Sequence, residues 1–406
     1  MRTAVIVLGD LGRSPRMQYH AVSLAADGAD VDLIGLEGAP VVDAVASEPR
    51  IHVHRLADRR FATRASSGLG RFVFGSALRA FSQAWGLFRT LTRVPAPQVI
   101  LVQTPPAVPT LFIAWVVSRL RGARLVIDWH NLSHTIAAMK VGDDHRAVKA
   151  IARSERRWAR RGDAHLTVSN ALAEWLAREY AITAAVVYDR PAAAFVRPDP
   201  ARAQALWATI AADTNLPATR IPIAVCPTSW TPDENFDLLL DALDRVERQL
   251  EPSAAPQLAV ILTGRGELRE AFEARVARWQ FRAVAVRTLW LEPADYPVLI
   301  GMADLGLCLH QSSSGLDLPM KLADLRGAGV PVAAYAYAPV ISEAITPGHE
   351  GLTFTDADGL ARVLIALATS LAADPNLARS RAWLAQNPAE RWDVQWQATA
   401  RAVLLK

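Results

Sequence analysis

The stretch from His310 to Asp324 combines serine, glycine, lysine and carboxylate side chains at a spacing that suits a nucleoside diphosphate. A Ser/Gly turn before a helix offers backbone N–H groups and hydroxyls to a diphosphate, and Lys321 adds a point charge. Asp324, one helical turn later, can accept hydrogen bonds from ribose hydroxyls. A polar loop that only caps a helix is the alternative, but it does not explain why all these groups occur together. The candidate donor-binding residues here are Ser312, Ser313, Ser314, Gly315, Leu316, Asp317, Lys321 and Asp324.

Two shorter loops extend the same candidate pocket. Thr228 and Ser229 follow an apolar run that ends at Cys226, so their side chains can contact phosphate, and Trp230 can form a wall of the pocket. In the second loop, Arg265 lies between two glycines and can pair with a diphosphate. Isolated turns of this kind are weak signals, and their recurrence after several predicted strands gives them weight.

The first turn of the chain, Gly9 to Pro15, offers a candidate general base. Asp10 ends the first predicted strand, where a carboxylate can deprotonate an acceptor hydroxyl. Gly12 lets the backbone approach a ligand, and the helix start at Ser14-Pro15 favours anions, so Gly12 and Arg13 join the candidate donor-binding residues. The spacing does not match G-x-G-x-x-G, and a purely structural turn is the alternative.

A second candidate for proton transfer is the pair Asp128 and His130, which follows the apolar run Arg124–Ile127. Polar residues at the carboxyl end of a parallel strand face the ligand crevice in doubly wound folds. The alternative is a histidine that only completes the hydrogen bonding of the core and has no role in catalysis. A zinc site is disfavoured because His130 and His134 lack a third ligand nearby in the sequence. Asp356 and Asp358 resemble a D-x-D metal site, but helix capping explains them more simply, and no metal site is predicted.

The elements that would position these residues alternate between short β-branched runs and longer amphipathic ones, the pattern of parallel sheets wound with helices. The Pro-rich stretch near 190–200 suggests a boundary, so we predict two domains, 1–195 and 196–406, with the last helix returning to the first domain. Two such domains would place ligands at the carboxyl ends of their strands, in the cleft between them. The predicted strands are Thr3–Leu8, Val31–Ile34, Ile51–Arg55, Gln98–Val102, Leu125–Asp128, His165–Val168, Ala185–Tyr188, Ile223–Cys226, Leu258–Leu262, Ala283–Val286, Leu305–Leu309, Pro331–Ala334 and Leu352–Phe354.

Composition excludes several classes of protein. With 406 residues, 51% of them hydrophobic, the chain is long and apolar enough for two folded cores and is not disordered. Its two cysteines, Cys226 and Cys308, cannot build a disulfide scaffold or a cysteine zinc site. No run reads as a signal peptide or a membrane span, so we expect a cytoplasmic protein.

The net charge of +4 is unevenly distributed. Residues 1–200 hold 26 Lys+Arg and 17 Asp+Glu, whereas residues 201–406 hold 18 and 23. Within the first half, the stretch from Arg50 to Arg93 contains nine arginines and one acidic residue, Asp58, with aromatics at helical intervals. Such a basic amphipathic helix suits an anionic membrane surface, and a core-packed helix with an arginine rim is the alternative. A nucleic-acid partner is not predicted, because no recognised binding motif accompanies the charge.

These motifs together resemble the chitobiosyldiphosphodolichol β-1,4-mannosyltransferases, which add mannose to lipid-linked chitobiose. The matching segments occur in order along the chain, and the last is the longest and most specific. They are Leu8–His20, Ile127–Asn131, Val187–Pro191, Thr228–Thr231, Trp290–Pro297 and Leu307–Lys321.

The resemblance implies an α/β fold of the GT-B class, with two facing Rossmann-like domains, and an inverting transfer that requires no metal or other cofactor. GDP-mannose would be the donor, with its guanine near Trp290 and Leu291. Asp10, Asp128 and His130 would be the candidates for the catalytic groups, with Asp10 ranked first as the base and His130 second, because the first-strand turn commonly supplies the base in inverting enzymes of this fold. The acceptor would be a GlcNAc-terminated glycan, in our interpretation linked to a lipid diphosphate at the cytoplasmic face of the inner membrane, with the 50–93 region on the membrane.

Two other functions remain open from the sequence. A GT-B enzyme could use another nucleotide sugar, either as a different hexosyltransferase or as an epimerase of UDP-sugars. Alternatively, the chain could be a non-catalytic membrane-surface adaptor in which the basic stretch is the functional part. Affinity for GDP, for UDP or for neither would distinguish the GDP-mannose-dependent transferase from these two alternatives.

Overall fold

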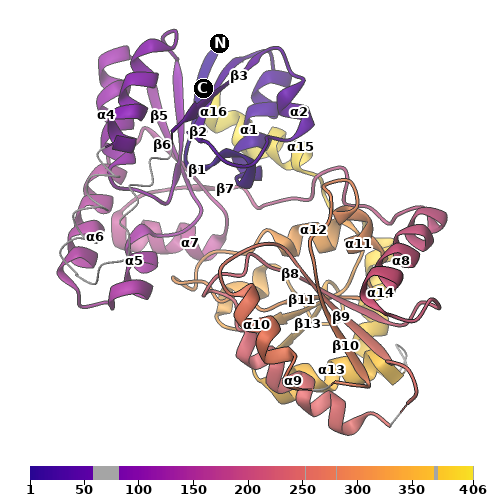
Figure 1. The fold of residues 1–406 in the computed structure, drawn as a ribbon. Coiled ribbons are helices and arrows are strands. Elements are labelled where there is room, and N and C mark those ends of the chain that lie inside the picture. Colours follow the sequence, from indigo (N-terminus) through magenta and orange to yellow (C-terminus); the bar gives the residue numbers. More distant parts are fainter. Residues whose placement is uncertain (58–81, 252, 280, 370–373, 406) are drawn as a thin grey trace. The chain divides into compact units, whose positions relative to one another are not determined.

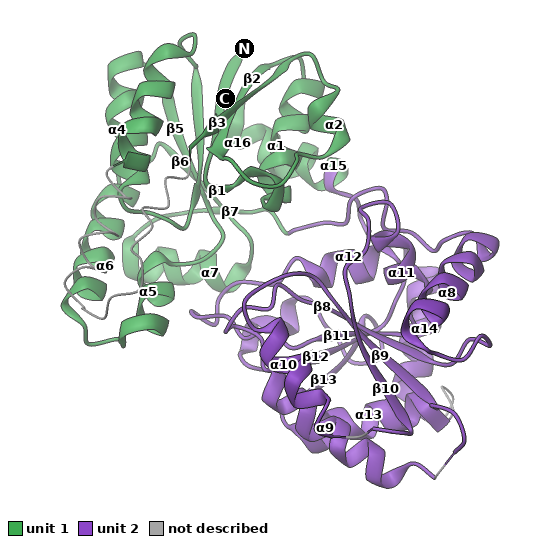
Figure 2. Ribbon diagram, viewed as in Figure 1, with its two compact units in different colours: residues 1–188, 393–406 green, residues 189–392 purple. Residues whose placement is uncertain are grey.

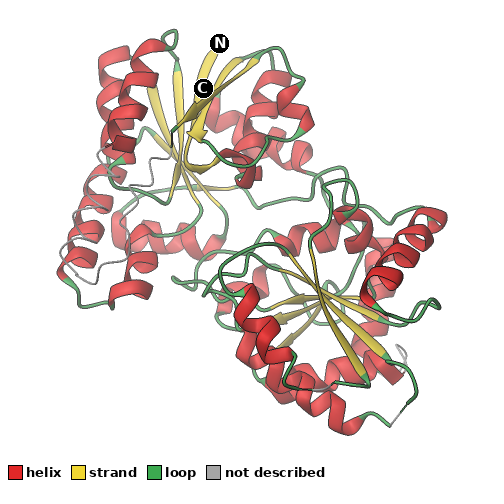
Figure 3. Cartoon of the chain, in the orientation of Figure 1, coloured by secondary structure: helices red, strands yellow, loops and turns green. Residues whose placement is uncertain are grey.

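The computed structural model describes residues 1–57, 82–251, 253–279, 281–369 and 374–405, which form two compact units (Figure 2). Unit 1 comprises Met1–Tyr188 together with Asp393–Lys406, and unit 2 comprises Asp189–Trp392. Each unit holds a sheet of parallel strands with helices packed around it (Figure 3). The α/β architecture predicted from the sequence is therefore confirmed in both halves of the chain.

The sheet of unit 1 has seven parallel strands in the order β3-β2-β1-β4-β5-β6-β7. Its central strands are buried on both faces, which is why their sequences are continuous β-branched runs and not alternating ones. Each strand predicted in this half has a counterpart. The bounds are β1 Arg2–Asp10, β2 Asp30–Leu36, β3 Ile51–Leu56, β4 Val99–Thr104, β5 Arg124–Trp129, β6 Ala164–Thr167 and β7 Ala185–Val186.

Helices cover both faces of this sheet. Figure 1 shows α4 and α6 along one side, and α1 with the C-terminal α16 along the other. The predicted helix start at Ser14-Pro15 is confirmed, although the Ser14 hydroxyl donates to the Asp10 carbonyl and does not cap the helix. The bounds are α1 Pro15–Ala26, α2 Asp43–Ala46, α4 Thr110–Arg121, α5 Ser133–Val141, α6 Arg146–Ala159 and α7 Asn170–Trp175, and residues 82–93 are also helical.

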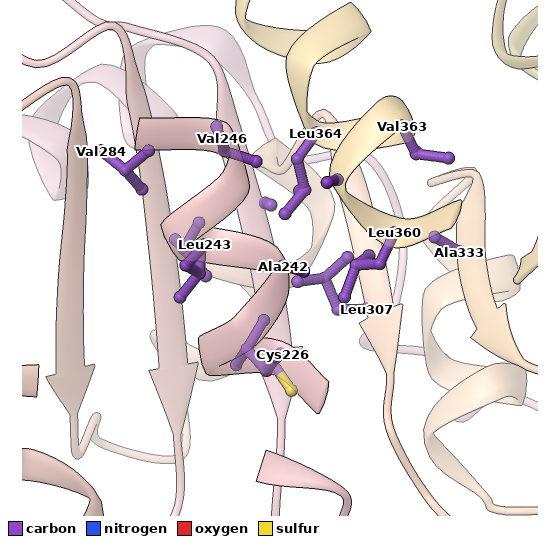
Figure 4. Packing of buried hydrophobic residues seen from close by; sticks show 14 of the residues in the cluster. Cys226, Ala242, Leu243, Val246, Val284, Leu307, Ala333, Leu360, Val363 and Leu364 are labelled. Atoms are coloured by element: carbon purple, nitrogen blue, oxygen red, sulfur yellow. The ribbon is translucent and has the colours of Figure 1, made fainter. Parts of the chain in front are cut away.

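The sheet of unit 2 has six parallel strands in the order β10-β9-β8-β11-β12-β13. On one of its faces, helices α9 and α13 pack side by side, so that Leu243 and Leu360 enter one apolar cluster with strand residues such as Leu307 (Figure 4). A second cluster fills the other face. The strand bounds are β8 Ile223–Pro227, β9 Leu258–Thr263, β10 Val284–Leu289, β11 Leu305–Cys308, β12 Val332–Tyr335 and β13 Gly351–Phe354.

The helices of unit 2 follow its strands in the usual alternation of a doubly wound fold. Their amphipathic sequences place apolar residues on the sheet, as in α9, where Leu239, Leu243 and Val246 are fully buried. The bounds are α8 Pro200–Thr214, α9 Phe236–Gln249, α10 Arg269–Val276, α11 Tyr296–Met302, α12 Lys321–Gly327, α13 Ala357–Thr369 and α14 Pro375–Gln386.

The end of the chain is helical and belongs largely to unit 1. It consists of α15 Trp392–Gln395, a π-helical turn over Trp396–Ala400 and α16 Arg401–Leu404. Trp396 is fully buried, and its indole N–H donates to His20 in α1 at 3.0 Å. Two polar contacts to Asp27, from Gln397 and Arg401, fix the same segment at the end of α1.

The predicted domain boundary at 195/196 is too late in the chain. The division falls between Tyr188 and Asp189, because the residues that follow pack on unit 2. Phe195 is buried in the second cluster of unit 2, and its ring lies edge-on against Tyr296 at 5.8 Å. An extended Pro-rich sequence therefore belongs to a domain surface here and is not a free linker.

None of the helices in the described ranges combines the length and the apolar composition that a bilayer-spanning segment requires. The basic stretch Arg50–Arg93, predicted to contact a membrane, lies partly outside the described residues, which omit 58–81. That prediction remains a prediction.

Candidate active site

Asp10 holds the first βα turn together through backbone hydrogen bonds. Its carboxylate accepts from the N–H of Gly12 at 3.0 Å and from the N–H of Ala39 at 3.0 Å, and Arg13 lies 3.8 Å away. A Cβ on Gly12 would lie 2.3 Å from the Pro40 carbonyl oxygen, so the close approach that this glycine allows is to the chain's own backbone. About a quarter of the Asp10 side chain, 27%, remains exposed.

Asp128, near the end of β5, is a fully buried charged group of unit 1. It forms a bidentate ion pair with Arg16 of α1, with Nε–Oδ2 at 2.8 Å and Nη2–Oδ1 at 3.0 Å. Arg16 is also buried and donates to the carbonyl of Val187 at 2.7 Å. Burial alone would raise the pKa of Asp128, but the Arg16 guanidinium and the two adjacent histidines hold it well below its usual range. Asp128 is therefore a carboxylate and not a proton donor.

His20 is the second partner of Asp128, and its protonation follows from its contacts. The Trp396 indole can only donate, so Nδ1 of His20 accepts and Nε2 carries the proton. That Nε2 lies 3.3 Å from Oδ2 of Asp128. Burial lowers the pKa of His20, and Asp128 offsets this only in part. His20 is thus a neutral donor that supports the carboxylate.

His130 is the partner of Asp128 that reaches the surface. Its Nε2 lies 3.1 Å from Oδ2 of Asp128, and 20% of its side chain is exposed. Because the carboxylate is ionised, the neutral imidazole presents Nε2–H to it, and the lone pair is on Nδ1. A carboxylate that orients an imidazole in this way prepares the other ring nitrogen to take a proton from a hydroxyl.

The segment that follows β5 is held by a buried side chain of α6. Glu155, fully buried on α6, accepts from the N–H of Ser133 at 2.9 Å and contacts Nδ1 of His134 at 2.8 Å. His134 is therefore tied to a carboxylate and not to a metal. Within the described ranges, no group of three or more His, Cys, Asp and Glu side chains could hold a metal ion.

In unit 2, the serine-rich loop between β11 and α12 is closed by its own hydroxyls. Ser312 Oγ accepts from the N–H groups of Ser314 and Gly315 at 3.2 and 3.1 Å, and Ser314 Oγ accepts from Leu316 N–H at 3.2 Å. Asp317 accepts from the Ser312 hydroxyl, and the Tyr337 hydroxyl donates to its carbonyl. The N–H groups predicted to bind a diphosphate are thus engaged inside the loop in this structure.

His310 joins this loop to the loop after β8. Its Nδ1 lies 3.0 Å from Asp233 and its Nε2 3.7 Å from Asp317. Burial lowers the pKa of His310, but the two carboxylates outweigh burial and raise the pKa to about 9. An imidazolium therefore stands between the two loops at neutral pH.

Lys321 and Asp324 both lie on α12, as predicted. Lys321 donates to Glu234, a carboxylate that is itself buried, and this pair keeps the pKa of the lysine raised although burial opposes its charge. Burial, with the charge of Asp189 as a smaller contribution, raises the pKa of Asp324 to about 7. The ribose-binding candidate thus titrates near neutrality.

The loops after β8 and β9 pack backbone against backbone. A Cβ on Gly264 would lie 1.9 Å from the Thr228 carbonyl oxygen, and one on Gly266 would lie 2.1 Å from that of Ser229. Thr228 is nearly buried, and its hydroxyl accepts from the N–H of Trp230 at 3.0 Å, whereas Ser229 is exposed. Ser229 is consequently the member of this turn whose side chain can meet a ligand.

The prediction that Trp230 forms a wall of the cleft is wrong. Its side chain is fully buried and stacks on Phe236 at 4.9 Å and against Phe272 at 5.3 Å. A left-handed backbone at this residue, with φ of 57°, turns the ring into the core.

Arg265 and Trp290 meet at the ends of β9 and β10. The guanidinium lies over the indole at 3.9 Å from the ring centroid, and Trp290 is 48% exposed. Leu291 packs partly on the second cluster of unit 2. A cation stacked on an exposed aromatic ring offers both a flat apolar surface and a positive charge, as a nucleoside diphosphate requires.

The capping interpretation holds for Asp356 and not for Asp358. Asp356 accepts from the N–H of Gly359 at 2.7 Å, and Asp358 pairs with Arg245.

The sequence analysis missed the groups that hold the candidate residues in place. Arg16, His20, Glu234 and His310 lie within the matching segments or beside them, but nothing in the sequence pairs Arg16 with Asp128 across 112 positions. Only His310 carried a signal, since it directly follows the apolar run Leu305–Leu309, where an ionisable side chain requires a partner.

Comparison with known proteins identifies the first half of the chain as a glycosyl transferase 4-like domain over residues 12–188. Over nearly the full length, the chain is 35% identical to chitobiosyldiphosphodolichol beta-mannosyltransferase of Mus musculus, covering 98% of this chain and 88% of the mouse protein. The Homo sapiens protein of that name is also 35% identical, with 98% and 92% covered. A protein of Arabidopsis thaliana named UDP-glycosyltransferase TURAN is 35% identical, with 99% and 97% covered.

Solved structures share the fold at low sequence identity. Sucrose-phosphate synthase from Thermosynechococcus elongatus matches with a TM-score of 0.71 at 16% identity, covering 98% of this chain and 97% of that one. Anabaena HepE in complex with UDP and glucose matches with a TM-score of 0.68 at 17% identity, with 99% and 98% covered. The fold is therefore GT-B, as expected. Since relatives of 35% identity cover nearly all of it, the chain belongs to the chitobiosyldiphosphodolichol beta-mannosyltransferase family of glycosyltransferases.

Proposed function

We propose that the protein transfers mannose from GDP-mannose, with inversion, to a GlcNAc-terminated acceptor linked to a lipid diphosphate, forming a β-1,4 linkage. The observation that carries this proposal is the 35% identity with chitobiosyldiphosphodolichol beta-mannosyltransferases over 98% of the chain. The reaction would take place at the cytoplasmic face of a membrane, where a lipid-linked acceptor is held.

On the acceptor side, the geometry favours His130 over Asp10 as the general base. His130 is oriented by Asp128 and partly exposed, whereas the Asp10 carboxylate already accepts from two backbone N–H groups. In the proposed step, His130 takes the proton of the acceptor hydroxyl while the hydroxyl oxygen bonds to the anomeric carbon of mannose. The bond from that carbon to GDP breaks, and the electron pair leaves with the diphosphate.

On the donor side, unit 2 supplies the groups for GDP. Arg265 stacked on Trp290 suits the guanine and the diphosphate, Lys321 adds positive charge, and Asp324 suits the ribose. Stabilising the charge that develops on the leaving diphosphate is the main catalytic contribution of such groups. We expect them to do so without a metal, which chelation with EDTA during the assay tests.

The first experiment combines purified protein, GDP-mannose and a panel of GlcNAc-terminated lipid diphosphates, with release of GDP as the readout. We expect release of GDP and a mannosylated product. A failure to release GDP with every acceptor would overturn the proposal. Thermal stabilisation by GDP compared with UDP decides the donor class, and this arm matters because one relative is named a UDP-glycosyltransferase.

The second experiment assigns the base. His130→Ala should lower turnover by roughly 10²–10⁴-fold while affinity for GDP-mannose is retained, since the loss falls on proton transfer. Asp10→Asn keeps the shape of the turn and is the matched comparison. A larger loss of turnover in Asp10→Asn than in His130→Ala would reverse the assignment.

A further inference from the structure

The outer surface of α6 is an arginine cluster. Arg153, Arg156 and Arg157 on the helix, with Arg160 and Arg161 just beyond its end, are all exposed and line one open hollow of the surface. Helical spacing places residues three and four positions apart on the same side, which gathers these guanidinium groups into one patch. We call these five residues the α6 cluster.

The charge of the α6 cluster is not neutralised by neighbouring carboxylates. In the part of the chain that the structure describes, no ion pair involves Arg153, Arg156 or Arg157. The one acidic residue of α6 itself, Glu155, points inward to Ser133 and His134. Like charges held together at this density are costly unless they meet an anionic partner.

Aromatic side chains lie beside the arginines. The Arg161 guanidinium stacks on Trp115 at 4.7 Å and on Trp158 at 5.0 Å, and Phe112 packs on Trp158 at 4.8 Å. Phe112 is 40% exposed. A patch that combines arginine with tryptophan and an exposed phenylalanine suits the interface of a membrane, where charged headgroups lie above apolar chains.

We infer that the α6 cluster docks the protein on an anionic phospholipid membrane. This inference rests on the proposed function, because an acceptor linked to a lipid has to be reached at a membrane. It also has a structural consequence for that site. The inner side of α6, through Glu155, contacts Ser133 and His134 at the start of α5, three and four residues after His130, so the helix proposed to contact headgroups also holds the segment next to the candidate base. A membrane explains the exposed Phe112, which a nucleic-acid backbone would not.

The test is flotation of the full chain with vesicles of phosphatidylglycerol and phosphatidylcholine, compared with pure phosphatidylcholine. The variant Arg153→Gln/Arg156→Gln/Arg157→Gln spares Arg160, which bonds the Tyr180 carbonyl, and Arg161, which stacks on two tryptophans. Of the substituted residues, Arg157 also lies over Trp158, at the longer distance of 5.4 Å. The matched control, Arg278→Gln/Arg362→Gln/Arg379→Gln, removes the same charge from exposed positions of unit 2.

We expect the wild type and the control to bind anionic vesicles, with binding weakened by salt, and neither to bind phosphatidylcholine alone. The α6 variant should bind roughly one hundredfold more weakly, at about fivefold per arginine. Equal binding by the two variants would overturn the inference. Binding of single-stranded DNA without binding of vesicles would also overturn it and would favour a nucleic-acid partner.

A pair of activity assays keeps this inference separate from the proposed function. With a water-soluble GlcNAc-terminated acceptor, the α6 variant should retain wild-type turnover, whereas with a lipid-diphosphate acceptor in anionic vesicles its activity should fall at least tenfold. If no acceptor is mannosylated, the proposed function fails while flotation still decides the membrane surface. An equal loss with both acceptors would show that the arginines act on the site and not on the membrane.

Discussion

At the level of single residues, the buried carboxylate of Asp128 organises the polar core of unit 1. Asp128 accepts from Arg16, His20 and His130, which come from two different helices or loops. Such a group costs free energy to bury and is retained where it fixes geometry. Here the geometry that it fixes is the ring of His130, so stability and the proposed proton transfer depend on the same carboxylate.

Replacing Asp128 with Asn should therefore affect both properties. Arg16 would lose its counter-charge inside the protein, which typically costs about 3–5 kcal/mol in the free energy of unfolding. His130 would face an amide, so turnover should fall even at temperatures where the variant is folded. Urea unfolding and steady-state kinetics measure the two effects. Asp358→Asn, which breaks an exposed pair with Arg245, is the control and should change neither. Wild-type turnover in folded Asp128→Asn would contradict the orienting role.

The raised pKa of Asp324 leads to a second prediction, which concerns how the free energy of unfolding depends on pH. Its pKa is raised to about 7 in the folded chain, so between pH 4 and 7 the folded state keeps a proton that the unfolded state has lost. The free energy of unfolding is therefore largest at the acidic end of this window. It falls as the pH rises toward 7 and levels off above it. Asp324→Asn carries no charge, so it should match the wild type near pH 4 and exceed it by roughly 4 kcal/mol at pH 8.

Scanning calorimetry from pH 4 to pH 8 measures this difference, and the exposed Asp241→Asn should give no such trend. The same substitution should weaken binding of GDP, because an amide is a poorer acceptor for the ribose hydroxyls. A gain in stability that is independent of pH would rule out titration of Asp324 as its cause.

Sequence reasoning found the side chains that end strands and missed those that hold them. Asp128 and His130 were predictable because they follow an apolar run at the end of a strand, and Lys321 because it follows a Ser/Gly turn at the start of a helix. Their partners were not, since Arg16 and Glu234 are paired through the fold over 112 and 87 positions. Trp230 shows the converse error: a tryptophan after a strand can line a pocket or enter the core, and only the left-handed backbone at that residue decides.

At the level of elements, the strands were the most predictable part. They are buried on both faces, so their β-branched runs stand out from the amphipathic helices between them. The domain boundary was less predictable, because proline restricts the backbone equally in a linker and in a segment that packs on a surface. Phe195, one apolar residue within that segment, was the sign that it packs.

The C-terminal helices give a prediction at this scale. Trp396 is fully buried in unit 1 and bonds His20, although it lies at the far end of the sequence. Trp396→Ala should cost about 3–5 kcal/mol, by opening a cavity and leaving His20 without its donor. Val394→Ala, at a side chain that is 56% exposed, is the matched control and should cost little. Urea unfolding followed by fluorescence measures both, and equal small losses would show that the segment is not part of the unit 1 core.

At the level of the whole molecule, the uneven charge becomes interpretable. The basic half of the sequence coincides with unit 1, which carries the α6 cluster and the candidate base, and the acidic half coincides with most of unit 2. The groups of unit 2 that we propose to bind phosphate are local, namely Arg265, Lys321 and the engaged N–H groups of the serine loop. The net positive charge of the basic half therefore agrees with the proposed membrane partner of unit 1. The net negative charge of the other half does not predict the proposed anionic ligand of unit 2.

The proposed assignment of GDP to unit 2 and of the acceptor to unit 1 predicts which segments a nucleotide protects from hydrogen exchange. GDP should slow hydrogen exchange in unit 2 over the loops at 228–231, 263–267, 289–292 and 310–324, and leave α1 and β5 of unit 1 unchanged. At one hundred times its dissociation constant, a ligand stabilises the state that it binds by about 2.7 kcal/mol. The serine loop should respond most, because its N–H groups would exchange their internal hydroxyl partners for phosphate oxygens. UDP at the same concentration is the control. Because Gly12 and Arg13 are also candidate donor-binding residues, protection of the turn at 10–13 in addition to these loops is compatible with the assignment. Protection confined to that turn, with none in the loops of unit 2, would place the nucleotide on unit 1 and reverse the assignment of donor and acceptor sides.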